Sequence, residues 1–139
     1  GVLTAADIDD LTQQSAGGLH PADYDLTGDN LVDSQDVAEW ISAADIYNSW
    51  LGDANLDNEF NSGDLVVVLA SGAYETDTES VWSSGDFDGS GRTNSGDLVA
   101  ALAGGGYELG PRAAVAAVPE PSALVLALIG LLAIVRRRR

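Results

Sequence analysis

DANLDNEFNSGDLVVVLASGAYE, residues 53–75, and DFDGSGRTNSGDLVAALAGGGYE, residues 86–108, are two copies of one unit. Aligned without gaps, 12 of their 23 positions are identical. A more diverged copy, DLTGDNLVDSQDVAEWI, begins at Asp25, and a half copy, GVLTAADI, begins at Gly1. Repetition at this spacing indicates a chain built from one supersecondary unit used several times.

Each complete copy opens with a 12-residue loop, at residues 25–36, 53–64 and 86–97. We call these the first, second and third loops. Position 6, where such a loop turns sharply, holds Asn or Gly, the residues that best tolerate positive φ. Side chains with oxygen atoms recur at positions 1, 3, 5, 9 and 12: Asp25, Thr27, Asp29, Asp33 and Asp36; Asp53, Asn55, Asp57, Asn61 and Asp64; Asp86, Asp88, Ser90, Asn94 and Asp97.

This spacing suits a hard divalent cation. Ca²⁺ takes about six to eight oxygen ligands, and a 12-residue loop supplies them from these positions together with the backbone carbonyl at position 7. Those carbonyls belong to Leu31, Glu59 and Arg92. The sequence predicts two to three calcium sites, with the third loop the weakest. The alternative is that the loops are metal-free turns in which Asp64 and Asp97 cap helices.

The loop pattern, Asp-x-Asn/Asp-x-Asp-Gly/Asn-x-apolar-Asn/Asp-x-x-Asp-Leu, resembles the type I dockerin repeat, an EF-hand-like calcium loop followed by a single helix. As in dockerins, position 12 is Asp rather than Glu. The resemblance implies an all-α fold of paired loop–helix repeats, Ca²⁺ as the cofactor and a cohesin-like protein as a possible partner. Positions 10 and 11, which help to read that partner, are Ser-Gly in the second and third loops, where dockerins usually carry a larger residue at position 11.

The repeats predict the organisation of the chain. Because the sequence lacks Met, we expect a processed product or the C-terminal part of a longer protein. Within each pair of repeats, we expect the position-8 residues to meet in a short β-bridge. Helices are expected near 4–14, 34–49, 62–71, 95–104 and 122–137. The expected domains are a first pair at 1–50, in which the half copy that begins at Gly1 is a truncated loop, a second pair at 51–108, a linker at 109–117 and a tail at 118–139.

The tail has three parts in a fixed order: Val118, Pro119, Glu120 and Pro121; a 13-residue apolar run; and Arg136, Arg137, Arg138 and Arg139. As a helix, the apolar run is about 20 Å long, which makes a short span against a hydrocarbon core of about 30 Å. The terminal Arg residues predict a single-pass helix with a cytoplasmic C-terminus and the acidic body outside.

This order of parts resembles the PEP-CTERM protein-sorting domain, also called the ice-binding protein C-terminal domain. The resemblance implies recognition of Pro-Glu-Pro by an exosortase-type enzyme, export to the cell surface or outer envelope, and anchoring that is at least transient. Together with dockerin-like repeats, the tail is similar to the C-terminal part of planctomycete surface proteins.

Charge separates the body from the tail. Residues 1–118 carry 21 acidic side chains against two Arg, a charge of −19, whereas residues 119–139 carry +3. A body of that charge repels nucleic acid, so no nucleic-acid partner is expected. The chain has no Cys and one His, and we find no catalytic constellation, so no enzyme activity is expected.

The leading hypothesis is a calcium-binding, non-catalytic region of an exported surface protein. The alternatives are an adhesion module with a cohesin-like partner, or the tail of a secreted polysaccharide-degrading enzyme. Trp50 and Trp82 precede the second and third loops by three and four residues. They could pack each loop against its helix or, if exposed, stack on sugars.

Overall fold

The computed structural model describes residues 2–113, which form an all-α fold. Two short 3₁₀ turns, η1 (Ala22–Tyr24) and η2 (Trp82–Ser84), accompany the α-helices. None of the helices within residues 2–113 is long and apolar enough to cross a membrane. The terminal helix expected at 122–137, with its membrane role, lies outside the described residues. The α-helices are α1 (Ala5–Gly17), α2 (Ser34–Ser42), α3 (Ser62–Ala70) and α4 (Ser95–Ala103).

Each of the four α-helices within residues 2–113 begins immediately after position 9 of a repeat copy. In the half copy that position is Thr4. In α3, the side chain of Asn61 accepts a hydrogen bond from the Gly63 N–H at 2.7 Å, and Asp64 reaches back to the Asn61 N–H at 2.9 Å. The same capping box opens the other three helices. A capping box satisfies backbone N–H groups that the first turn would leave unpaired. It fixes the helix starts at the residues where the repeat pattern predicts them.

The helix ends differ from the expected ones. The α1 helix continues to Gly17 rather than residue 14, and Gly18 closes it in the left-handed region at φ 63°. The α2 helix ends at Ser42 rather than residue 49, because the chain turns back after Ala43 and the Ser49 N–H bonds to the Ile41 carbonyl at 2.7 Å. That bond satisfies a carbonyl at the end of the helix and returns the chain to the body ahead of the second loop.

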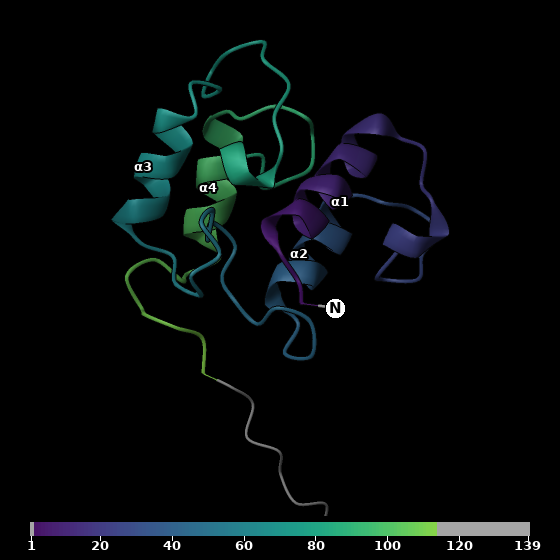
Figure 1. Ribbon diagram of the computed structural model, residues 1–139, viewed down its shortest axis with the longest axis horizontal. Helices are drawn as coiled ribbons and strands as arrows, with labels where there is room; N and C mark the ends of the chain where they lie inside the picture. The colour runs from purple at the N-terminus through teal and green to yellow at the C-terminus, as the bar shows by residue number, and fades with distance from the viewer. Residues whose placement is uncertain (1, 114–139) are drawn as a thin grey trace, which may run out of the picture.

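The second and third repeats hold each other through their main chains. The Glu75 N–H, after α3, bonds to the Thr93 carbonyl in the third loop at 2.8 Å. Reciprocally, the Glu108 N–H, after α4, bonds to the Phe60 carbonyl in the second loop at 2.8 Å. Figure 1 shows α3 and α4 side by side in one half of the body, with α1 and α2 in the other.

The β-bridge has a different partner from the expected one. Phe60, at position 8 of the second loop, pairs in parallel with Tyr107 and not with position 8 of the third loop, Thr93. The Phe60 and Tyr107 rings meet edge to face with centroids 5.3 Å apart, and both residues lie beside the Glu108 bond. The expected bridge is therefore wrong, because the residues after each helix, rather than the opposite loop, pair with position 8.

The η2 turn connects the two halves of the body. Trp82 is fully buried, and its ring meets that of Phe87 edge to face at 4.9 Å. Its indole N–H donates to the Asp53 carbonyl at 2.9 Å, and its backbone N–H donates to the Thr12 hydroxyl on α1 at 3.1 Å. Full burial rules out sugar stacking by Trp82 and establishes it as a packing residue between α1 and the second loop.

Candidate metal centres

The Asp at position 1 organises the turn of each loop. One carboxylate oxygen accepts the N–H of position 5 and the other accepts the N–H of position 6. These bonds wrap the backbone around the carboxylate and leave it at the concave side of the loop. The donors are Asp29 and Asn30 for Asp25 (3.1 and 2.9 Å), Asp57 and Asn58 for Asp53 (3.0 and 2.9 Å), and Ser90 and Gly91 for Asp86 (2.9 and 2.8 Å).

Left-handed backbone at two positions makes these bonds possible. Position 6 has φ 68°, 70° and 81° in the three loops, and position 4 has φ 78°, 58° and 69°. Asn and Gly at position 6 match the expectation from the sequence. At position 4 the second loop holds Leu56. The left-handed conformation is energetically unfavourable for Leu because its Cβ crowds the backbone. The hydrogen bonds of the surrounding loop hold Leu56 in this strained conformation.

The Asp at position 12 closes each loop. Its Oδ2 accepts the N–H of position 9 at 2.9 Å in all three loops. Its Oδ1 accepts the N–H groups of positions 2 and 3 in the first and third loops, and that of position 3 in the second loop. The same carboxylate therefore caps the following helix and ties the start of the loop to its end. The residues are Asp36, Asp64 and Asp97, each fully buried.

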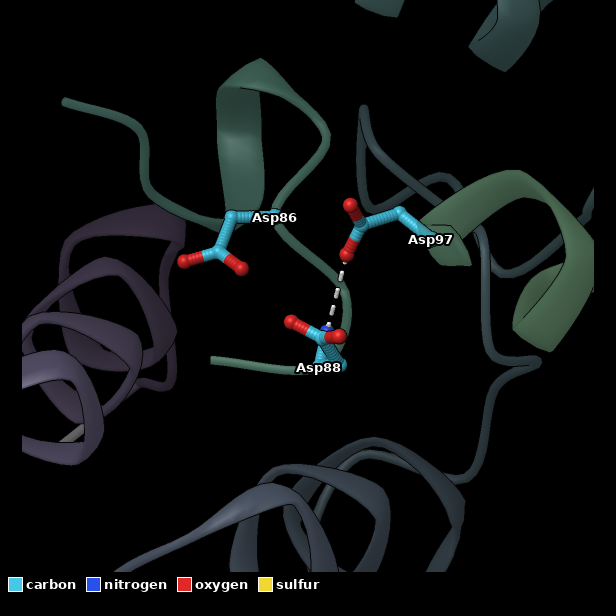
Figure 2. A group of neighbouring side chains, drawn as sticks. All are labelled: Asp86, Asp88 and Asp97. Carbon is cyan, nitrogen blue, oxygen red and sulfur yellow. Dashed lines mark hydrogen bonds between the residues drawn. The ribbon is translucent and has the colours of Figure 1, made fainter. Parts of the chain in front are cut away.

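The third loop brings three carboxylates together. Oxygen atoms of Asp86, Asp88 and Asp97 all lie within 4.8 Å of one another. Figure 2 shows them around a common space, with Asp97 bonded to the Asp88 N–H at 3.2 Å. Such a group of oxygen ligands suits Ca²⁺, which offsets the mutual repulsion of the carboxylates. Ser90, at position 5, adds a hydroxyl at the edge of this group, 3.4 Å from Asp86.

Burial changes the acidity of these groups. Burial, with the charges of Asp97 and Asp88, raises the pKa of Asp86 to about 7. Burial, with the charge of Asp64, raises the pKa of Asp53 to about 6, and burial also raises the pKa of Asp97. These shifts mean that the ionised carboxylates lack a counter-charge in the protein itself.

The pKa of Asp36 shifts in the opposite direction. Burial opposes ionisation there too, but N–H groups of Asp33, Thr27 and Leu26 outweigh it and lower the pKa of Asp36. Hydrogen bonds to an ionised carboxylate stabilise its charge in the same way as a nearby cation, although less strongly. Asp97 has the same number of backbone donors, but burial outweighs them there, so the pKa values of Asp36 and Asp97 shift in opposite directions.

The remaining predicted ligands lie on the same loops. Asn55 and Asp57 side chains each accept a backbone N–H two residues further on, from Asp57 and Glu59, at 2.9 and 3.0 Å. Asp29 does the same with Leu31 at 2.8 Å. The structure thus places the predicted side chains of positions 1, 5 and 12 around each loop as part of its backbone scaffold.

Sequence reasoning missed one residue that supports the second loop. Ser49 is fully buried, and its hydroxyl donates to Asp53 Oδ2 at 2.5 Å. The residue lies outside the repeat and four positions before the loop, so the pattern of oxygen ligands contains no signal for it. It stabilises the ionised form of a carboxylate that burial makes less acidic.

Comparison with known proteins gives one result, and it concerns the tail. No curated protein and no solved structure matches the chain. The PEP-CTERM protein-sorting motif matches residues 117–139, which include Pro119, Glu120, Pro121 and the terminal Arg residues. These residues lie outside the part that the structure describes. The match supports export, direction to the cell envelope and processing by an exosortase-type enzyme. The chain thus ends in a PEP-CTERM sorting signal.

Proposed function

We propose that this chain is a calcium-binding, non-catalytic module placed immediately ahead of its sorting signal. Two to three Ca²⁺ ions bind the 12-residue loops and stabilise the body outside the cell. The sorting enzyme then acts on the tail, which anchors the protein at the surface by a single-pass helix with a cytoplasmic C-terminus. The module serves as a folded spacer between that anchor and any preceding domains.

The arrangement of Asp86, Asp88 and Asp97 carries the proposal. Three carboxylates converge within 4.8 Å, two of them fully buried, although their charges repel one another. A divalent cation compensates such a group more completely than N–H donors do. The other two loops share the Asp residues of positions 1 and 12, held by similar backbone donors, and we extend the proposal to them on that ground.

Calorimetry tests the calcium sites directly. The whole chain in a mild detergent, titrated with CaCl₂ after removal of metal, should show two to three sites of micromolar to low-millimolar affinity, in the range of calcium sensors and extracellular modules. Helical circular dichroism should rise with occupancy, because binding free energy contributes to folding. An absence of binding at millimolar Ca²⁺ would exclude the proposal.

A matched pair of variants assigns the third site. Asp97→Asn removes one buried carboxylate and should abolish one site, while the other sites remain. Asp45→Asn removes an exposed acid outside the loops and should leave every site intact. Equal loss of binding in the two variants would mean that bulk charge, rather than the loop, attracts the ion.

A second candidate function is adhesion through a cohesin-like partner. Its support is an exposed apolar pair on each of two matching helices: Val66 and Leu69 on α3, and Val99 and Leu102 on α4, all at least half exposed. Purified cohesin domains on a sensor surface, with Ca²⁺ and then EGTA, test it. Calcium-dependent binding that Val66→Ser and Val99→Ser weaken supports adhesion, and no binding to any cohesin excludes it.

A further inference from the structure

Arg112 is fastened to the body although it lies in the expected linker. Its guanidinium Nη1 donates to the carbonyls of Ser42 and Ser49, at 2.9 and 3.0 Å. The guanidinium carbon lies 5.0 Å from the centre of the Trp50 ring, a cation–π arrangement. Two carbonyls and an aromatic face together form a site for a cation that the chain itself supplies.

Trp50 holds the same segment from the other side. Its indole N–H donates to the Gly110 carbonyl at 2.8 Å, and the chain passes so close that a Cβ on Gly106 would lie 2.4 Å from the ring. The chain between Gly106 and Arg112 is therefore laid against one tryptophan. This segment is the yellow-green trace that follows α4 in Figure 1.

The holding residues are part of the approach to the second loop. Ser49, whose carbonyl accepts Arg112, donates its hydroxyl to Asp53 at 2.5 Å. The Asp53 N–H in turn bonds to the Trp50 carbonyl at 3.1 Å. Asp53 is the position-1 residue of the second loop. Its carboxylate is bonded to Ser49 and its backbone to Trp50, two of the residues that hold Arg112.

We propose that Trp50 and Arg112 form a latch that Ca²⁺ in the second loop closes, and that the latch fixes the point where the chain leaves the body ahead of the sorting motif. The calcium dependence rests on the function proposed above. The contacts of Trp50 and Arg112 stand independently of it.

The latch sets the reach of the sorting motif. With Arg112 held, six residues, 113–118, lie between it and Pro119 and span at most about 20 Å. With the latch open, the last main-chain attachment is that of Glu108 to Phe60, and the ten residues 109–118 span at most about 35 Å. A closed latch therefore keeps the acidic body close to the membrane site of processing.

Trypsin is a selective probe because the body has only two cleavage sites. Arg92 and Arg112 are the only basic side chains before the terminal Arg cluster. Cleavage after Arg112 requires its side chain to leave the two carbonyls and Trp50, and so it reports latch opening. Cleavage after Arg92, inside the third loop, reports loosening of the body. The experiment uses the whole chain in detergent, with fragments identified by mass spectrometry.

Variants at saturating Ca²⁺ test the latch itself. Trp50→Ala should speed cleavage after Arg112 at least tenfold and leave Arg92 unchanged. Trp50→Phe keeps an aromatic ring but loses the indole donor. Its rate of cleavage after Arg112 should lie between those of the unchanged protein and Trp50→Ala. Gly106→Ala should also open the latch with both partners present, whereas Gly17→Ala, whose Cβ meets nothing within 4 Å, should not. Unchanged cleavage in both Trp50→Ala and Gly106→Ala would overturn the latch.

The coupling between calcium binding and the latch is tested by the same substitution at position 5 of two different loops. Asp57→Ala, at position 5 of the second loop, should leave Arg112 rapidly cleaved at all Ca²⁺ concentrations. Asp29→Ala, at position 5 of the first loop, should keep cleavage calcium-sensitive. Equal effects of the two variants would overturn coupling through the second loop.

Calorimetry on the same samples separates the two proposals. Calcium binding without protection of Arg112 refutes the coupling and leaves the calcium module standing. An absence of calcium binding refutes the module and the coupling together, while the effects of Trp50→Ala and Gly106→Ala still decide whether the latch exists.

Discussion

Buried carboxylates set the energetics of the loops at the scale of single residues. Asp53, Asp86 and Asp97 are fully buried, and each has a pKa above the ordinary Asp value of 3.8. Burial of a charge is unfavourable unless hydrogen bonds or an opposite charge compensate it. The second and third loops of the metal-free protein therefore each contain an unfavourable buried charge that a bound cation would compensate.

The unfavourable burial of these ionised carboxylates predicts how the stability of the metal-free protein depends on pH. Because the folded pKa values of Asp53 and Asp86 are raised to about 6 and about 7, the folded protein binds more protons than the unfolded chain between pH 4 and 7. The free energy of unfolding should therefore fall as pH rises through that interval. Melting temperatures in EDTA should decrease from pH 5 to pH 8.

Two controls accompany the pH series. Saturating Ca²⁺ should flatten the decrease, since the ion keeps the carboxylates ionised, and Asp86→Asn should reduce its slope. Asp36, with its lowered pKa, affects stability only below about pH 4 and does not mask the trend. A melting temperature that rises from pH 5 to pH 8 in EDTA would contradict this account.

Ser49 gives a second prediction at this scale. Ser49→Ala leaves one oxygen of the buried Asp53 without its hydroxyl donor, which costs about 1–3 kcal/mol. Ser95→Ala, at the exposed first position of α4, provides the control, and its stability should stay close to that of the unchanged protein. Urea unfolding in Ca²⁺ measures both, and equal stabilities would show that the Ser49 bond is not stabilising.

At the scale of elements, the two Glu residues that end the repeats support each other's helices. The Glu75 carboxylate accepts the N–H of Ser95 at the start of α4, at 2.8 Å, and Glu108 accepts the N–H of Ser62 at the start of α3, at 3.3 Å. A negative charge at a helix N-terminus is favourable. The conserved spacing of Tyr-Glu in the two copies thus has a structural explanation that the sequence alone does not reveal.

Single substitutions of the two Glu residues test this exchange. Glu75→Ala and Glu108→Ala should each destabilise the protein by about 1 kcal/mol, with the larger effect at Glu75, whose bond is shorter. Glu79→Ala removes an acid outside these contacts and should be nearly neutral. Chemical unfolding measures all of them, and a Glu79 variant as damaging as the other two would point to net charge instead.

The elements also show what sequence reasoning could and could not reach. Helix starts depend only on residues close in sequence, because the cap at position 9 and the acid at position 12 lie three residues apart. The capping roles of Asn61 and Asp64 could therefore be predicted from the pattern alone. The end of α2 is not local, because it depends on Ser49 returning to Ile41. The partner of Phe60 likewise depends on Tyr107, 47 residues further along the chain.

At the scale of the whole molecule, a short segment separates the sorting motif in sequence from the last described residue that the body holds by its side chain. The PEP-CTERM motif occupies residues 117–139, and within residues 2–113 that last residue is Arg112. Recognition by the sorting enzyme should therefore depend on the motif residues themselves, whereas the loops affect only the reach of the motif through the latch proposed above. The division of the molecule into a folded module and a sorting tail follows from this separation.

Processing of the exported chain tests whether the folded module and the sorting tail have separate roles. In a host with an exosortase, Glu120→Ala together with Pro121→Ala should leave the chain unprocessed, while Asp97→Asn should be processed normally if it folds. Immunoblots of envelope fractions distinguish the processed and unprocessed forms by mobility. Normal processing of the Pro-Glu-Pro variant would show that the matched motif does not direct sorting in this chain.

The exchange of main-chain bonds between the second and third repeats gives export a direction. Phe60 meets Glu108 only after the 47 residues between them in sequence have crossed the membrane. A chain threaded from its amino end therefore leaves this pair open until shortly before Pro119 arrives. Once folded, a pair of repeats cannot return through a channel that admits only an extended chain. The last pair of repeats would then act as a ratchet, which holds the chain in place while the sorting enzyme engages the tail.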